Sequence, residues 1–196
     1  MKKRLIVATR NAHKVEEIRA ILDNYEVCDL SVLTDPPEVE ETGTTFLANA
    51  TLKALAISEI TDDLVLSDDS GLEVDVLGGA PGVYSARYGG EDGNDGLNNE
   101  KLLRELSGVS NRTGRFRCVM VLAKAGKALV DFSGAAEGRI LEAPATGEGG
   151  FGYDPLFVPD GFSESYSQLG EEIKNRLSHR AAALKGVSAW LTNEQS

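Results

Sequence analysis

Two adjacent carboxylates, Asp68 and Asp69, are the side chains whose surroundings best suit them to chemistry. They follow the apolar residues 64–66 and precede Ser70 and Gly71. A short apolar run that ends at Asp-Ser-Gly predicts a buried strand with the acids at its tip, where open α/β sheets bind their ligands. Close carboxylates repel each other unless a cation is present, and a hard divalent cation such as Mg2+ takes oxygen ligands of this kind. A solvated turn is the alternative that these residues on their own would favour.

Polar and basic residues from Thr9 to Lys14 follow a second apolar run, residues 5–8, and open a predicted helix. The N–H groups at a helix N-terminus point at anions, the helix dipole favours negative charge there, and Asn11 has the side chain of an N-cap. Arg10 and Lys14 add positive charge, which indicates a phosphate site. The spacing of a Walker loop is absent, and an ordinary strand-to-helix turn with a surface lysine is the alternative.

Two acids and a lysine accompany the helix predicted for about residues 45–60. Glu40 and Glu41 lie in the loop before it, and either could share a metal with the acids above, although an acidic loop is usually only solvated. Lys53 lines up with Asn49 on a polar stripe, because residues four apart share one face of a helix. A lysine on such a stripe could face the ligand, while exposure to solvent is the ordinary alternative.

A glycine-rich segment, residues 149–155, has the composition of a binding loop. Phe151 lies between two glycines, which leave its ring open for stacking on a flat ligand, and Asp154 could accept a hydrogen bond from a base or a sugar. A glycine-rich turn with a core aromatic is the alternative. Lys174 and residues 178–180 lie at a predicted loop-to-helix junction, where the arginine could donate to a base carbonyl or bind a phosphate.

The elements that position these groups include both strands and helices, which predicts an α/β fold with a mixed sheet. The stretch at residues 124–127 predicts a hairpin turn. The predicted strands cover residues 5–8, 25–32, 64–67, 115–123, 128–140 and 156–158, and the glycine-rich residues 72–94 predict a short strand followed by an ordered loop. The predicted helices follow Asn11 and cover about residues 45–60, 95–107 and 178–191.

The 196 residues fit one domain, or one domain with two lobes. A net charge of −11 argues against a protein that coats nucleic acid but allows a small polyanionic ligand. No apolar run is long enough to span a membrane, and the apolar stretch after the basic start is too short for a signal peptide, so the cytoplasm is the expected location. Two cysteines and two histidines without ligand spacing argue against a structural zinc site.

These segments, in order from about residue 5 to residue 185, resemble the inosine triphosphatase family. The resemblance rests on Thr9-x-Asn11-x-x-Lys14 and on residues 40–50 (EETGTTFLANA), 68–72 (DDSGL), 78–87 (GGAPGVYSAR), 149–155 (GGFGYDP) and 178–180 (SHR). Arg10 and His13 depart from the family, in which small or other residues, commonly glycine, are frequent at both places.

Members of that family are nucleoside triphosphate pyrophosphatases that act on xanthosine and inosine (deoxy)triphosphates. The resemblance implies an elongated mixed β-sheet flanked by helices in two lobes with a central cleft, a single catalytic domain over residues 1–196, and a homodimer. It implies that Glu41 and Asp69 bind Mg2+, that Asp69 is also the base, and that Ser70 contacts the substrate. It assigns the triphosphate to Thr9, Arg10, Asn11, Ala12, His13, Lys14 and Lys53, and the base and sugar to Phe151, Gly152, Tyr153, Asp154, Lys174, His179 and Arg180.

The predicted function is a Mg2+-dependent hydrolase that cleaves dITP, ITP and XTP to the monophosphate and pyrophosphate, and so keeps deaminated purine nucleotides out of DNA and RNA. Its predicted partners are the purine nucleotide and a second copy of the chain, without nucleic acid or membrane. A pyrophosphatase of the Maf type is one alternative, against which the Phe-Gly-Tyr-Asp and Ser-His-Arg segments argue. A catalytically idle nucleotide sensor is another, against which the presence of both Glu41 and Asp69 argues.

Overall fold

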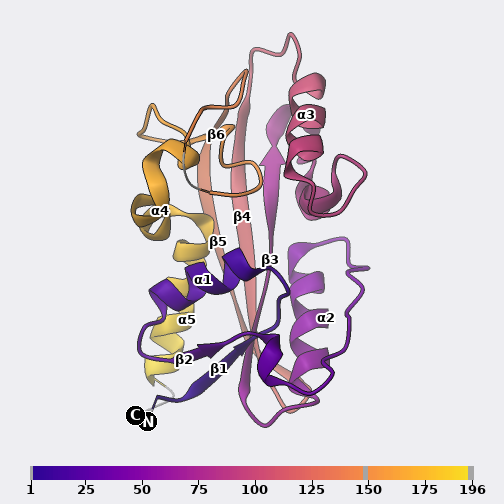
Figure 1. The fold of residues 1–196 in the computed structure, drawn as a ribbon, viewed down its shortest axis with the longest axis vertical. Coiled ribbons are helices and arrows are strands. Elements are labelled where there is room, and N and C mark those ends of the chain that lie inside the picture. Colours follow the sequence, from indigo (N-terminus) through magenta and orange to yellow (C-terminus); the bar gives the residue numbers. More distant parts are fainter. Residues whose placement is uncertain (1, 148–149, 194–196) are drawn as a thin grey trace. The chain divides into compact units, whose positions relative to one another are not determined.

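Six strands form one sheet in the computed structural model, which describes residues 2–147 and 150–193 (Figure 1). The strands are β1 (Arg4–Val7), β2 (Glu26–Cys28), β3 (Leu64–Val74), β4 (Thr113–Lys124), β5 (Lys127–Ile140) and β6 (Phe157–Pro159), in the spatial order β2-β1-β3-β4-β5-β6. The helices are α1 (Ala12–Ile21), α2 (Phe46–Ser58), α3 (Asp95–Glu105), α4 (Tyr166–Leu177) and α5 (His179–Asn193). Strand β1 is parallel to β2 and β3, whereas β5 and β6 are antiparallel, so the predicted α/β class with a mixed sheet is confirmed.

The chain divides into two compact units. Unit 1 contains Met1–Asp69, Cys118–Gly134 and Arg180–Ser196, and unit 2 contains Ser70–Arg117 and Ala135–His179. Strands β3, β4 and β5 supply residues to both units. The two lobes with a central cleft, the elongated shape and the single catalytic domain stay predictions.

In unit 1, helices cover both faces of β1 and β3 (Figure 1). On one face, Ile6 and Val65 pack with Ile57 of α2. On the other face, Leu66 belongs to a buried cluster that includes Val15 of α1 and Leu184 of α5. Because side chains alternate between the faces of a strand, neighbouring residues of β3 meet different helices.

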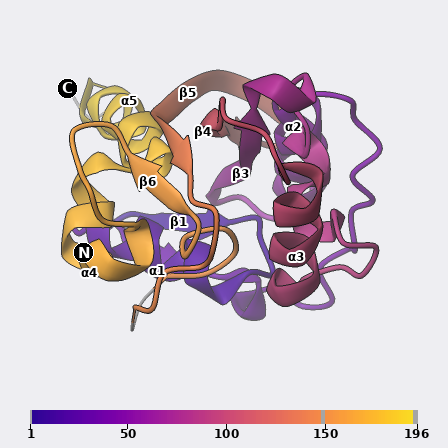
Figure 2. The ribbon, with the colours of Figure 1, turned by 90° about the horizontal axis from the view of Figure 1, so that it is seen from above.

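In unit 2, the second half of β3 packs into a separate core. Leu72 and Val74 belong to a buried cluster with Leu102 of α3 and with Phe157 of β6. Figure 2 shows α4 running beside β6. Among the residues that the structure describes, no helix combines the length and the apolar character needed to cross a membrane.

The prediction that β3 ends at the acids is wrong. The strand continues to Val74, so Asp68 and Asp69 lie in its middle rather than at its tip. Ser70-Gly71 has the composition of a turn, but Leu72 and Val74, which follow it in the chain, are fully buried, and this favours continuation of the strand. The backbone there is also satisfied, since Leu72 donates its N–H to the Ser85 hydroxyl over 2.9 Å.

Of three further elements, one strand is shorter than predicted, one hairpin is confirmed and one helix was not predicted. The strand predicted for residues 25–32 is only β2, because a 3-10 turn (Leu30–Val32) follows, capped by the Asp29 side chain. The hairpin between β4 and β5 is confirmed, and both turn residues, Ala125 and Gly126, have the positive φ of a type I′ turn, 49° and 72°. Helix α4 was not predicted, so Lys174 lies within a helix and not in a loop.

Candidate functional site

The two acids of β3 face opposite sides of unit 1. Asp69 shares the face of Val65, toward α2, and Asp68 shares the face of Leu66, toward α1 and α5. Both are buried, with 5% of Asp69 and none of Asp68 exposed. The acids predicted as a close pair are therefore two separate groups with different partners.

On the α2 face, Asp69 belongs to an acid–lysine group, which also contains Glu41 and Lys53. The Lys53 ammonium lies 2.6 Å from Glu41 Oε1 and 3.8 Å from Asp69 Oδ1. The other Asp69 oxygen accepts a hydrogen bond from Asn49 Nδ2 over 3.1 Å. Asn49 and Lys53 are one turn apart on α2, as the predicted polar stripe requires, and Thr45 caps this helix by accepting the N–H of Ala48. Helix α2 thus presents an amide and an ammonium to two carboxylates.

The charges of this group set its titration. Burial, together with the nearby Glu41, raises the pKa of Asp69, although Lys53 and Lys14 act against the rise. Burial alone would lower the pKa of Lys53, but the carboxylates of Asp69, Asp68 and Glu41 outweigh it and raise the pKa above its ordinary value. The lysine is therefore a firmly held cation, while Asp69 takes up a proton more readily than an ordinary aspartate.

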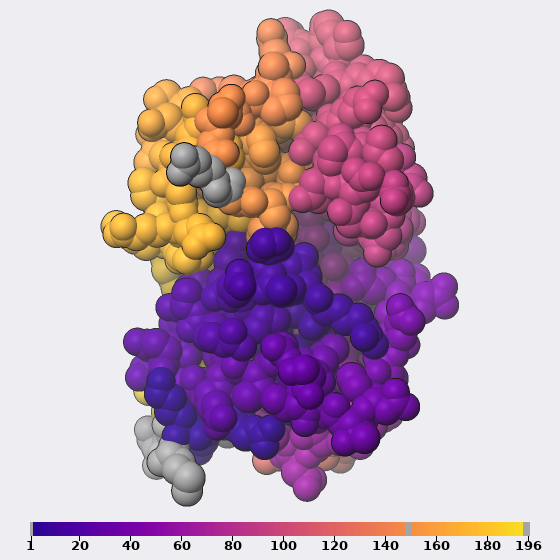
Figure 3. All heavy atoms as spheres, viewed as in Figure 1, coloured from indigo at the N-terminus to yellow at the C-terminus, as the bar shows by residue number. Residues whose placement is uncertain are grey.

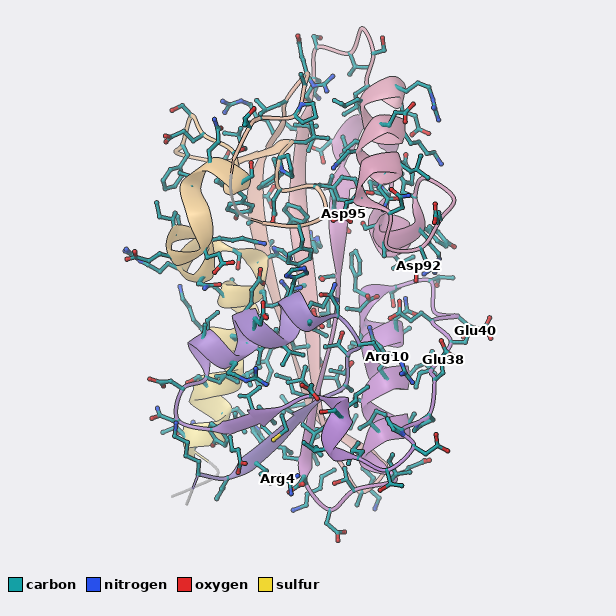
Figure 4. All side chains as sticks on the ribbon, in the orientation of Figure 1. Arg4, Arg10, Glu38, Glu40, Asp92 and Asp95 are labelled. Atoms are coloured by element: carbon teal, nitrogen blue, oxygen red, sulfur yellow. The ribbon has the colours of Figure 1, made fainter. Side chains whose placement is uncertain are left out.

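The structure separates Glu40 from Glu41. Glu41 is half-buried and bonded to Lys53. Glu40 is exposed, and Figure 4 shows it on the outer side of the loop, pointing away from α2. Of the two glutamates that the sequence left open, only Glu41 shares an ammonium with Asp69.

The donor set of this group fits Mg2+. Among the described residues no three or more His, Cys, Asp or Glu side chains gather into a metal site. Mg2+ does not require one, because it is usually held by one or two carboxylates together with phosphate oxygens and water. Glu41 and Asp69 are two such carboxylates and already converge on one positive charge, that of Lys53.

On the opposite face of β3, Asp68 forms a buried ion group with Lys14, Glu17 and Arg180. Asp68 Oδ2 lies 3.1 Å from Lys14 Nζ and 3.1 Å from Arg180 Nη2. Arg180, 1% exposed, also donates to Glu17. Burial raises the pKa of Asp68, but Lys14, Arg180 and Lys53 outweigh it and hold that pKa well below the usual range. Burial likewise opposes the charge of Arg180, but Asp68 and Glu17 raise its pKa.

The predicted phosphate segment lies at the start of α1. Asn11 is the N-cap, and its side chain accepts the N–H groups of His13 and Lys14. The Thr9 hydroxyl accepts the N–H of Asn11 over 3.1 Å. Residues 10–13 are exposed, and the indigo N-terminal part of the chain lies at the surface of unit 1 in Figure 3. Arg10 donates to the carbonyl of Pro36 over 3.4 Å.

In unit 2, three residues of the predicted base site come together. Asp154 Oδ2 accepts the N–H of Phe151 over 2.8 Å and a hydrogen bond from Lys174 Nζ over 2.7 Å. The same ammonium lies 4.3 Å from the centroid of the Phe151 ring. Gly149 of this motif lies outside the described residues. The lysine thus joins the segment to α4.

The other predicted base-site residues have different surroundings. His179 is 5% exposed and stacks on Phe116, with ring centroids 4.8 Å apart. Tyr153 is buried, and its hydroxyl donates to the carbonyl of Ser85. Ser70 is a half-buried residue of β3. Arg180 belongs to unit 1 and to the buried ion group.

Sequence reasoning missed two members of these groups. Glu17, the partner of Arg180, lies three residues after Lys14, and this helical spacing was the available signal. No signal in the sequence pointed to Phe116, because its stacking partner His179 is distant in the sequence. The sequence predicts Asp68 and Asp69 as a close pair, but the alternation of side chains along the longer strand separates them.

Comparison with known proteins identifies the family of this chain. The model of the Ham1 family matches residues 5–190. Curated proteins named dITP/XTP pyrophosphatase are 48% identical in Bacillus licheniformis, over 96% of this chain and 98% of the relative, and 45% identical in Bacillus subtilis, over 96% and 97%. The solved structure of the Staphylococcus aureus Ham1 protein is similar with a TM-score of 0.87 and 39% identity, over 98% of this chain and all of that one. The resemblance predicted from the motifs is confirmed, and the chain belongs to the Ham1 family.

Proposed function

We propose that this chain is a Mg2+-dependent pyrophosphatase that hydrolyses dITP, XTP and ITP to the nucleoside monophosphate and pyrophosphate. The predicted class of enzyme, a nucleoside triphosphate diphosphatase, is confirmed through the family and through relatives named dITP/XTP pyrophosphatase that match nearly the whole chain. ITP as a substrate, the products and the dependence on Mg2+ are proposals.

One observation carries the proposal, the convergence of Glu41 and Asp69 on the Lys53 ammonium. The two carboxylates are the residues that would hold Mg2+. When bound, the ion neutralises polyphosphate charge and makes water a stronger acid. Asp69 is also the group that would take a proton from the attacking water, as the resemblance implies, because a carboxylate within reach of that water can act as a general base. Lys53 supplies a fixed positive charge to the same group.

The start of α1 would bind the phosphates. Its exposed first turn offers backbone N–H groups and the positive end of the helix dipole. Lys14 adds a charge that its contact with Asp68 holds in place. Thr9, Arg10, Asn11, Ala12 and His13 complete the segment, as the resemblance implies.

The base and sugar are assigned to Phe151, Gly152, Tyr153, Asp154, Lys174, His179 and Arg180. The contact of Lys174 with both Asp154 and Phe151 supports this assignment, because it orders a ring suitable for stacking on a purine. Arg180 is bonded to Asp68 and Glu17, and its assignment to the base follows from the resemblance alone. A contact between Ser70 and the substrate, the homodimer and the removal of deaminated purine nucleotides are predicted by the resemblance. The cytoplasmic location stays an expectation from the sequence.

The experiment is pyrophosphate release from dITP, XTP, ITP, ATP and dTTP, with Mg2+ and after its removal by a chelator. We expect pyrophosphate, not orthophosphate, from the first three and about a hundredfold less from ATP. Donors that bind the C6 oxygen of a deaminated purine would face the C6 amino group of adenine, and two such unsatisfied groups at about 1–3 kcal/mol each would give this ratio. A preference for dTTP would favour the Maf alternative. Binding of dITP without hydrolysis would favour the sensor.

A further inference from the structure

Helix α3 holds both peptide groups of Gly152 in the glycine-rich segment of unit 2. The N–H of Gly152 donates to Asp95 Oδ2 over 2.6 Å. Its carbonyl accepts a hydrogen bond from Asn99 Nδ2 over 3.0 Å. Asp95 and Asn99 are four residues apart, so they project from one face of the helix. Figure 4 shows Asp95 next to this segment.

The segment needs an external restraint at this point. Gly152 has a φ of 63°, in the left-handed region that glycine enters without strain. Glycine also has the largest conformational freedom to lose, so the residue beside Phe151 does not fix its own backbone. A donor and an acceptor at fixed spacing on a helix remove that freedom from both sides of the residue.

Helix α3 is itself firmly attached within unit 2. Leu102 and Leu106 bury its apolar side in the core of the unit. Asn98 accepts the N–H of Gly89 over 2.6 Å and donates to the carbonyl of Ala86 over 3.0 Å. Through Asp95 and Asn99, a well-packed helix therefore fixes the position of the glycine-rich segment.

We infer that Asp95 and Asn99 are positioning residues, which hold Gly152 so that Phe151 keeps the orientation in which it meets the nucleotide base. This inference rests on the proposed function, in which Phe151 stacks on the base. The pair acts through the segment, since its hydrogen bonds end on the backbone of Gly152. Asp154 accepts the N–H of Phe151 itself, and the Lys174 ammonium lies against the Phe151 ring.

The test compares Asp95→Ala and Asn99→Ala with the wild type and with Glu100→Ala. Glu100 is exposed on the same helix, and its substitution also removes a negative charge. We expect each of the first two to raise the KM for dITP about 2- to 10-fold, the loss that corresponds to one net hydrogen bond, with a smaller change in kcat. Asp95→Asn keeps an acceptor oxygen and should restore the wild-type KM. Glu100→Ala should leave both constants unchanged.

A double-mutant cycle separates positioning from a general loss of structure. If the pair acts through Phe151, then adding Asp95→Ala to Phe151→Ala raises the KM no further. The inference would be overturned if Asp95→Ala raised the KM equally in the wild type and in Phe151→Ala. It would also be overturned if neither Asp95→Ala nor Asn99→Ala changed the KM of the wild type. Failure of the proposed function is distinguishable, because the wild-type enzyme would then release no pyrophosphate from dITP.

Discussion

Replacing Arg180 by methionine tests the buried ion group of unit 1. The substitution keeps a long stem but removes the guanidinium that lies 3.1 Å from Asp68 and also donates to Glu17. Asp68 is fully buried, so it cannot gain water in exchange. Removing one partner of a buried ion pair costs about 3–5 kcal/mol, because the other charge stays buried without compensation.

The structure places the expected cost at the lower end of that range. Lys14 still lies 3.1 Å from Asp68, and the Glu17 side chain is 13% exposed and can be partly hydrated. We therefore expect Arg180→Met to lower the free energy of unfolding by about 3 kcal/mol. For a chain of this size, that corresponds to a fall in Tm of roughly 6–12 °C.

The assay is urea unfolding followed by circular dichroism, with Arg117→Met as the matched control. Arg117 is also an arginine in an ion pair, 2.8 Å from Glu73, but its side chain is 47% exposed. Exposed pairs contribute about 0–1 kcal/mol, so this variant should unfold close to the wild type. Equal stabilities of the two variants would contradict the role assigned to burial, because the Arg180 side chain is 1% exposed and the Arg117 side chain 47% exposed.

Two other substitutions test the catalytic and phosphate roles. Asp69→Asn keeps the shape of the side chain but loses the proton acceptor and the metal-binding charge. Pyrophosphate release from dITP should therefore fall at least about 10²-fold with unchanged thermal unfolding. Near wild-type turnover would remove Asp69 from the mechanism. Lys14→Ala should weaken the binding of ITP more than that of IMP, because the start of α1 faces the outer phosphates in the proposal. Calorimetric titration in Ca2+, which limits turnover, measures both affinities, and equal losses would contradict the assignment.

Local signals in the sequence predicted much of unit 1 correctly. Asn11, the predicted N-cap, begins α1 where its side chain indicated. The alignment of Asn49 with Lys53 followed from helical spacing alone, and both residues contact Asp69. These predictions succeeded because the interactions that decide them lie within one turn of the chain.

Predictions that depend on distant residues failed. Ser70-Gly71 appeared to end β3, but the core of unit 2 buries Leu72 and Val74 and continues the strand. Helix α4 is a local failure, because Ser165 and Gln168 form a capping box at its start while Gly170, with a φ of 79°, interrupts the helical pattern. The anchoring of Gly152 by α3 joins residues more than fifty positions apart, which no local pattern reveals.

The most direct test of the metal-dependent mechanism compares two neighbouring glutamates. Glu41 contacts Lys53 over 2.6 Å, in the group that includes Asp69, whereas Glu40 is exposed. The measurement is pyrophosphate release from dITP over a Mg2+ titration, for the wild type, Glu41→Gln and Glu40→Gln. We expect Glu40→Gln to follow the wild-type curve and Glu41→Gln to require at least about tenfold more Mg2+, since the loss of a ligand charge weakens binding. The same Mg2+ dependence in both variants would contradict this mechanism.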